Sequence, residues 1–99
     1  VLTMVRKEIM QSCISERQAQ MDDLQKQIEQ INTAYEKLEF EEDMYYHLKN
    51  NSSHYRDVYT QKQEEYSKKL EKIDSEKQEL QDKMKILQRE IDYISNRLK

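Results

Sequence analysis

Few side chains in this 99-residue chain have the spacing that metal binding or catalysis requires. His47 and His54 lie seven residues apart with Asp43 and Asp57 nearby, so a weak divalent-cation site can be drawn on one helix face. Metal sites normally need three or four convergent ligands, and both histidines share a solvent-facing position of the helix. We therefore predict solvated surface histidines, with no metal ion and no cofactor.

Other reactive or modifiable groups are equally sparse. A single cysteine, Cys13, excludes an intrachain disulfide. Asn50-Asn51-Ser52 and Asn51-Ser52-Ser53 match the glycosylation sequon, which a cytosolic protein would leave unused. Tyr45 follows Glu41, Glu42 and Asp43, an acidic context that would suit a tyrosine kinase. Catalysis needs groups that several elements hold in a pocket, and the chain has no nucleophile constellation and no glycine for a phosphate loop. We predict that it is not an enzyme.

Composition points to extended helices. Glycine and proline are both absent, 37% of the residues are charged and 35% are apolar, against the usual 45–50% apolar in globular domains. That content supplies one apolar stripe on a helix but no compact core. The net charge of −3 argues against a nucleic-acid partner. No apolar run approaches the ~20 residues of a membrane span, so we expect no direct membrane insertion.

One heptad frame runs from Met10 to Leu98, and 19 of its 26 a and d positions are apolar. Such a pattern predicts an all-α fold in which one long, mostly continuous helix forms a two-stranded coiled coil. The a and d side chains predicted to form the oligomer interface with another helix, from a second copy or a heteromeric partner chain, are Met10, Ile14, Met21, Leu24, Ile28, Ile31, Tyr35, Leu38, Tyr66, Leu70, Ile73, Leu80, Met84, Leu87, Ile91, Ile94 and Leu98.

The frame divides the chain into zones within a single coiled-coil segment, residues 1–99. Residues 1–9 form an off-frame N-terminal helix, 10–41 and 64–99 are heptad zones, and 42–63 is a middle zone with a polar core. A chain that does not begin with Met and stops while its heptads still run is expected to be an excerpt of a longer protein.

The middle zone has apolar residues outside the a and d positions. A third helix or a globular partner could dock there, and the predicted docking residues are Met44, Tyr45, Leu48, Tyr55, Val58 and Tyr59. The acidic run nearby, Glu36, Glu39, Glu41, Glu42 and Asp43, is either a solvated face or a docking patch for a basic partner.

The middle zone is compatible with two folds, a continuous helix and a hairpin. Asn50-Asn51-Ser52-Ser53 is the weakest helix-forming run, because short polar side chains compete for backbone hydrogen bonds, so an antiparallel hairpin with a turn near Asn50–Ser53 is the alternative fold. We favour one continuous helix, because no glycine is present to adopt a positive φ and the heptad phase is retained across the run.

The polar residues in the seam favour antiparallel pairing. In a parallel homodimer, Arg17, Glu42, Lys49, Arg56 and Lys77 would each face a like charge. Antiparallel pairing of residues whose numbers add to 101 removes these layers. It places Ile28 opposite Ile73 and Tyr35 opposite Tyr66, while Arg17 meets Met84 and Lys49 meets Ser52. The same pairs arise in a hairpin or in an antiparallel dimer of straight helices.

These features predict a structural interaction module. The expected function is a coiled-coil rod of a cytoskeletal or cell-division scaffold, cytoplasmic and cytoskeleton-associated, that mediates oligomerisation and partner docking. The alternatives are a helical stalk or lever of an ATP-driven machine, which a turn at Asn50–Ser53 would favour, and a membrane-traffic tether. In composition the chain resembles scaffold coiled coils of many kinds, and no motif selects one family.

Overall fold

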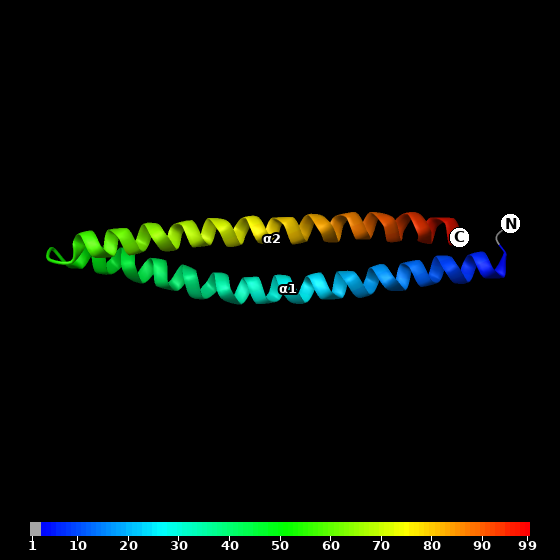
Figure 1. Ribbon diagram of the computed structural model, residues 1–99, viewed down its shortest axis with the longest axis horizontal. Helices are drawn as coiled ribbons and strands as arrows, with labels where there is room; N and C mark the ends of the chain where they lie inside the picture. Colours follow the sequence, from blue (N-terminus) through cyan, green and yellow to red (C-terminus); the bar gives the residue numbers. More distant parts are fainter. Residues whose placement is uncertain (1–2) are drawn as a thin grey trace. The chain divides into compact units, whose positions relative to one another are not determined.

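The computed structural model describes residues 3–99, and it consists of two long helices (Figure 1). α1 spans Met4–Asn51 and contains 48 residues, and α2 spans Arg56–Leu98 and contains 43 residues. The described part of the chain has no strand, which confirms the predicted all-α class. The residues predicted as the off-frame helix 1–9 include Val1 and Leu2, which lie outside the described residues.

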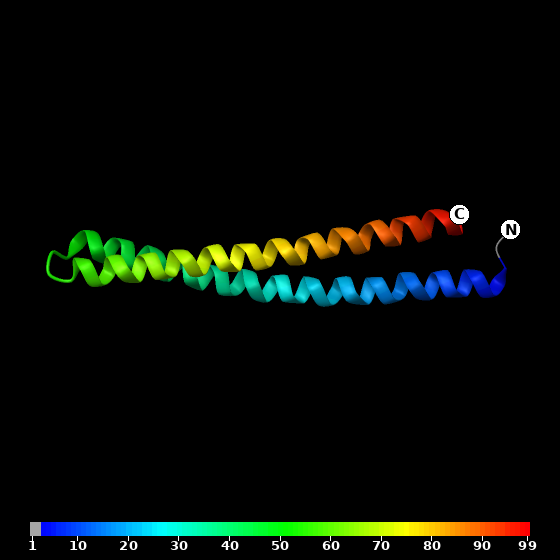
Figure 2. The same cartoon turned by 45° about the horizontal axis from the view of Figure 1, so that its top comes forward.

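The chain divides into two compact units, and each contains a segment of both helices. Unit 1 contains the described residues up to Ile28 together with Glu79–Lys99, and unit 2 is Glu29–Gln78. Within unit 1 the beginning of α1 and the end of α2 lie side by side in opposite directions (Figure 2). Within unit 2 a short turn connects the two helices, which again run antiparallel. Of the two predicted arrangements, the structure adopts the hairpin.

The preference for a single continuous helix is therefore wrong. The turn, residues 52–55, needs no glycine because no described residue has a positive φ. The Ser52 hydroxyl accepts a hydrogen bond from the Tyr55 amide at 3.3 Å, and the Tyr55 carbonyl accepts the first backbone bond of α2 from the Tyr59 amide at 3.1 Å. The Ser52 side chain thus accepts a hydrogen bond from an amide that would otherwise bond to a backbone carbonyl of a continuing helix. This local bond favours the turn.

The N-terminus of α1 is capped in the same manner. Thr3 Oγ1 accepts a hydrogen bond from the Arg6 amide at 3.0 Å, and the Thr3 carbonyl accepts one from the Lys7 amide at 3.0 Å. A threonine at this position satisfies an amide that has no partner within the helix. Val5 and Ile9, which lie off the heptad frame, are 66% and 54% exposed.

Burial in both units follows the heptad frame. All 26 a and d positions lie in the described residues, and all but Arg56 are buried or half-buried. Ile28 and Ile91 are the most enclosed, at 6% and 7% exposed, and both belong to unit 1. All 17 predicted interface residues consequently line the seam between α1 and α2 of one chain. Their contact with a second chain stays a prediction.

The antiparallel register differs from the predicted one by about one heptad. Arg17 reaches Glu90 rather than the level of Met84, and Tyr45 contacts Tyr59 and Tyr66 rather than Arg56. The numbers of these contacting residues add to between 104 and 111, near 108 rather than 101. A repeat of seven fixes which faces meet but leaves shifts of whole heptads open, and here the position of the turn selects among them.

The observed register preserves the charge pattern from which antiparallel pairing was predicted. With a sum of 108, Arg17 lies level with Ile91, Lys77 with Ile31, and Lys49 with Tyr59. Each charged seam residue still faces a neutral one, so no like-charge layer forms inside the hairpin.

Candidate functional site

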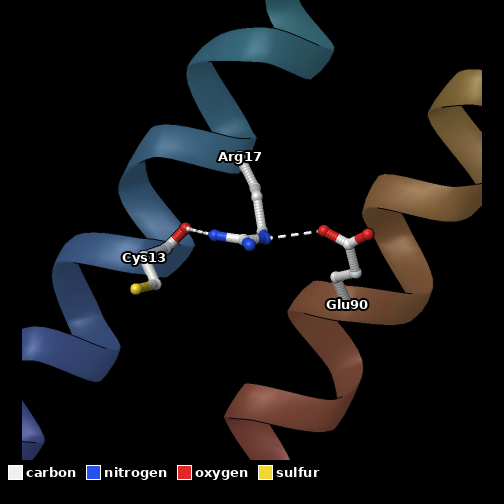
Figure 3. A network of polar contacts seen from close by, with 3 residues as sticks. All are labelled: Cys13, Arg17 and Glu90. Carbon is white, nitrogen blue, oxygen red and sulfur yellow. Dashed lines mark hydrogen bonds and ion pairs between the residues drawn. The ribbon is translucent and has the colours of Figure 1, made fainter.

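In unit 1 an arginine replaces an apolar residue in the seam, at position d (Figure 3). Arg17 Nε donates a hydrogen bond to Glu90 Oε1 at 2.8 Å, and Arg17 Nη1 donates to the Cys13 carbonyl at 3.1 Å. The hydrogen bond to Glu90 raises the pKa of Arg17, although partial burial acts in the opposite direction. The side chains of Arg17 and Glu90 remain 29% and 44% exposed, so the pair lies at the edge of the seam and joins α1 to α2.

Replacing Arg17 by leucine should raise the melting temperature by a few degrees, because leucine completes the apolar seam and Glu90 can turn to water. Replacing Arg17 by alanine should lower it, because the arginine stem also packs. Circular dichroism melts of the two variants would measure both shifts. If leucine destabilised as much as alanine, the ion pair would contribute more than seam packing.

In unit 2 three polar residues at a positions form a relay across the seam. Lys49 Nζ donates to Gln63 Oε1 at 2.8 Å, and Gln63 Nε2 donates to Glu42 Oε1 at 3.1 Å. Gln63 from α2 therefore lies between a cation and an anion that are one heptad apart on α1. The relay gives these three polar side chains hydrogen-bond partners within the seam of the observed register.

Aromatic side chains supply the apolar packing in the same unit. Tyr45 stacks on Tyr59 with ring centroids 6.2 Å apart and meets Tyr66 edge-on at 5.2 Å. Tyr55, from the turn, meets Tyr59 at 6.4 Å. These contacts connect the turn to the seam of unit 2 and compensate for the missing aliphatic residues of the middle zone.

The Tyr66 hydroxyl of this cluster lies next to a carboxylate. A hydrogen bond with the Glu41 carboxylate raises the pKa of Tyr66, and burial and the negative charge of Glu41 act in the same direction. Lys69 Nζ lies 4.4 Å from the centre of the Tyr66 ring. The neutral hydroxyl is thus the form that the folded unit favours.

Unit 2 should lose stability in alkaline solution through this hydroxyl. Because the folded pKa is higher than the unfolded one, the contribution is complete below about pH 10 and disappears as pH rises through the folded pKa. The difference in melting temperature between the wild type and Tyr66→Phe should therefore shrink between about pH 9 and pH 11. The control is Tyr93→Phe, at an exposed site in unit 1, whose melting temperature should equal that of the wild type at both pH values. A constant difference between wild type and Tyr66→Phe would contradict the role assigned to Glu41.

The predicted docking residues fall into two groups. Tyr45 and Tyr59 lie half-buried in the seam and belong to the aromatic cluster. Met44, Leu48, Tyr55 and Val58 are 36%, 38%, 56% and 54% exposed, outside the seam. Contact of either group with a partner stays a prediction. Of the two groups, the exposed one is accessible to a partner.

The sequence reasoning missed Phe40, which is 68% exposed on α1. Its heptad position faces solvent, so a search limited to the seam passes over it. The signal that could have found it is the spacing of Phe40, Met44 and Leu48, which recurs every four residues and defines a second apolar stripe.

The residues of the acidic run also fall into a group at the seam and an exposed group. Glu42 belongs to the relay and Glu41 lies beside Tyr66, whereas Glu36, Glu39 and Asp43 are exposed. An open hollow of about 340 Å³ lies among Phe40 and four of these carboxylates, those of Glu36, Glu39, Glu42 and Asp43. Part of the run is thus a border of carboxylates around an exposed phenyl ring.

A second open hollow, of about 380 Å³, lies in unit 1 above Leu24 and Leu87. Its rim consists of Gln20, Asp23, Gln27, Lys83 and Ile86. No pair of these groups has the base-and-nucleophile arrangement of a catalytic site.

The histidines are separated in the structure. His47 Nε2 lies 3.4 Å from Asp43 Oδ1 on one turn of α1, whereas His54 lies in the turn with its ring 4.6 Å from that of Tyr55. Among residues 3–99 no group of three or more His, Cys, Asp or Glu side chains could hold a metal ion. Neither described helix contains a segment apolar and long enough to cross a membrane.

Comparisons with protein-family models, with curated proteins and with solved structures found no match to this chain.

Proposed function

We propose that this chain is a non-enzymatic interaction module, an antiparallel coiled-coil hairpin that associates with further helices in a scaffold. The observation that carries the proposal is the incomplete burial of its seam. Of the 17 apolar side chains predicted to form an interface, Ile28 and Ile91 alone are buried, and the rest are half-exposed. Helices gain most of their stability from packing an apolar face, so these side chains favour additional contacts.

The exposed area supports the same proposal. The chain exposes 7847 Å² at a mass of 12.2 kDa, whereas a monomeric protein of this mass usually exposes about 6,100 Å². The excess is of the order of a standard protein–protein interface, about 1,600 Å² counted over both partners. Association of the hairpin with itself or with another helix would remove part of this surface from water.

A cytoplasmic scaffold associated with the cytoskeleton or with cell division is the cellular role we propose. The hairpin determines where such a module would connect to the rest of a scaffold, because the beginning of α1 and the end of α2 lie together in unit 1 (Figure 1). Flanking segments would therefore attach at unit 1, and unit 2 would carry the turn and the exposed side chains of Phe40, Met44, Leu48, Tyr55 and Val58.

Sedimentation equilibrium of the chain tests association. The average mass should rise with concentration, and the melting temperature should rise with it, because association stabilises the folded state. A mass of one chain and an unchanged melt over about a hundredfold range of concentration would reject self-association.

A stalk or lever of an ATP-driven machine is the second candidate, and the turn at residues 52–55 favours it. The heptad frame permits pairings with sums of 101 and 108, and neither creates a like-charge layer. A hairpin with two permitted registers could relay motion by sliding one helix along the other. A tether in membrane traffic differs from the scaffold only in the anchors attached to its ends.

A further inference from the structure

An apolar stripe lies outside the seam of unit 2, and nothing in the hairpin covers it. We define the outer stripe as the side chains of Phe40, Met44 and Leu48 on α1, Tyr55 in the turn and Val58 at the beginning of α2. Their exposed fractions are 68%, 36%, 38%, 56% and 54%. The four-residue spacing on α1 places the first three on one face, and this is the arrangement that a second amphipathic helix covers in helix-in-groove recognition.

The charges beside the outer stripe differ between its two sides. On α1, Glu36, Glu39 and Asp43 border Phe40 around the hollow of about 340 Å³. Glu36 and Glu39 have no ion-pair partner among the described residues, and Asp43 has the neighbouring His47. This side therefore presents uncompensated negative charge next to an apolar surface.

The α2 side is nearly neutral. Lys62 Nζ and Lys69 Nζ lie 3.8 Å and 3.5 Å from opposite oxygens of the Glu65 carboxylate. Two lysines share one glutamate, so the net charge of the group is about +1 and part of it is directed into the Tyr66 ring. A partner that crosses the outer stripe would meet negative charge along one edge only.

We propose that the outer stripe binds a helix of another protein whose apolar face carries Lys or Arg along the one edge that lies over Glu36, Glu39 and Asp43. The inference deepens the proposed interaction function and rests on it. The partner's leucine-like side chains would cover Phe40, Met44 and Leu48, and its basic side chains would compensate the carboxylates.

Charge selects this occupant over two others. A second copy of the chain packed antiparallel on the stripe would bring two sets of Glu36, Glu39 and Asp43 together, which costs free energy. An anionic membrane surface would be repelled by the same carboxylates. Along α1 the stripe runs from Phe40 to Leu48, eight residue steps or about 12 Å, so three turns of a partner helix suffice. Such a contact is small, and we expect affinity on the order of micromolar.

The test uses the whole chain and two synthetic peptides constrained to be helical. Both carry leucines at i, i+4 and i+8, and one edge of each carries lysines in the first peptide and glutamates in the second. Fluorescence anisotropy should show saturable binding of the lysine peptide that weakens with salt, and at least about tenfold weaker binding of the glutamate peptide.

Variants of the chain locate the contact. Phe40→Ser with Met44→Ser, and separately Glu39→Lys with Asp43→Lys, should each weaken binding of the lysine peptide by at least about tenfold. The matched control is Ile86→Ser with Tyr93→Ser, which changes side chains that are 57% and 65% exposed in unit 1 and should leave binding unchanged. All these positions are exposed, so circular dichroism should show folded helices in every variant.

Four results would overturn the inference. They are no saturable binding, equal binding of both peptides, an equal loss in the unit 1 control, and conversion of a self-associated wild type to monomer by Phe40→Ser with Met44→Ser. The last result would identify a second copy as the occupant. A chain that self-associates but ignores the lysine peptide rejects the partner chemistry while the proposed function stands, and a chain that does neither rejects both.

Discussion

Replacing Ile91 by alanine should lower the free energy of unfolding by about 2–5 kcal/mol, the usual cost of emptying a large side chain's site in a packed interior. Ile91 is 7% exposed and Ile28, in the same unit, is 6% exposed. A two-helix seam has no other layer that could close over the gap, so the loss is not relieved by repacking. Thermal melts by circular dichroism would measure it, and Ile28→Ala should behave alike.

The control uses the same substitution at an exposed site of the same unit. Ile86 is 57% exposed, and Ile86→Ala should change stability by less than about 0.5 kcal/mol. His47→Ala, on the solvent face of α1, should be nearly neutral for the same reason. If Ile86→Ala melted as early as Ile91→Ala, the assignment of the seam would be wrong.

The seam itself could be predicted from the sequence, because a heptad pattern reports directly which side of a helix is apolar. Spacing alone assigns Ile14, Leu24 and Leu87 to the seam, and each of them is half-buried in the structure. Polar seam residues such as Arg17 and Lys49 added the direction of pairing, since like charges disfavour parallel helices. Burial and charge therefore determined the faces and their antiparallel orientation.

Continuity could not be predicted, because the competing contributions are small and local. The absence of glycine favoured a continuous helix, yet residues 52–55 reverse the chain without a positive φ. The Ser52 hydroxyl and the Tyr55 carbonyl provide the hydrogen bonds that start α2. The retained heptad phase was no evidence for a continuous helix, because a hairpin needs compatible faces as well.

The exposed site was predicted in part. Met44, Leu48, Tyr55 and Val58 were recognised because they lie off the seam in a zone with a weak seam, and they are exposed in the structure. Tyr45 and Tyr59 could not be separated from them, since a tyrosine ring packs while its hydroxyl reaches water. Phe40 was missed because a single solvent-facing apolar residue is common on protein surfaces.

A cysteine at position 97 should crosslink to Cys13 within one chain, and this result would test the hairpin and its register together. Both positions are at g on the same flank of unit 1, and Arg17 bridges the Cys13 carbonyl and Glu90 nearby. With a sum of 108, residue 97 lies about 3 Å along the helix axis from the level of Cys13, at 1.5 Å per residue. A short bifunctional thiol reagent should therefore join Arg97→Cys to Cys13 in high yield.

Lys83→Cys provides the matched comparison, since Lys83 is also a basic residue at g. In the observed register it lies about 18 Å from the level of Cys13, whereas in the register with a sum of 101 it would lie about 7.5 Å away and residue 97 about 13.5 Å away. Efficient crosslinking at 83 with little at 97 would therefore show that the helices have moved by one heptad. Yields at both sites would show that the two registers are populated together, as a sliding lever requires.

The mass of the crosslinked product distinguishes the hairpin from a dimer of straight helices, which would make the same contacts between two chains. A hairpin gives a product of one chain's mass, and an antiparallel dimer gives twice that mass. The unmodified chain has Cys13 alone, and it should not crosslink to itself, because in either antiparallel arrangement no second thiol lies nearby. Efficient crosslinking of unmodified chains in pairs would require two α1 helices side by side, either in two associated hairpins or in a parallel homodimer. In the parallel homodimer the like charges of Arg17, Glu42 and Lys49 would have to reach solvent at the edges of the seam.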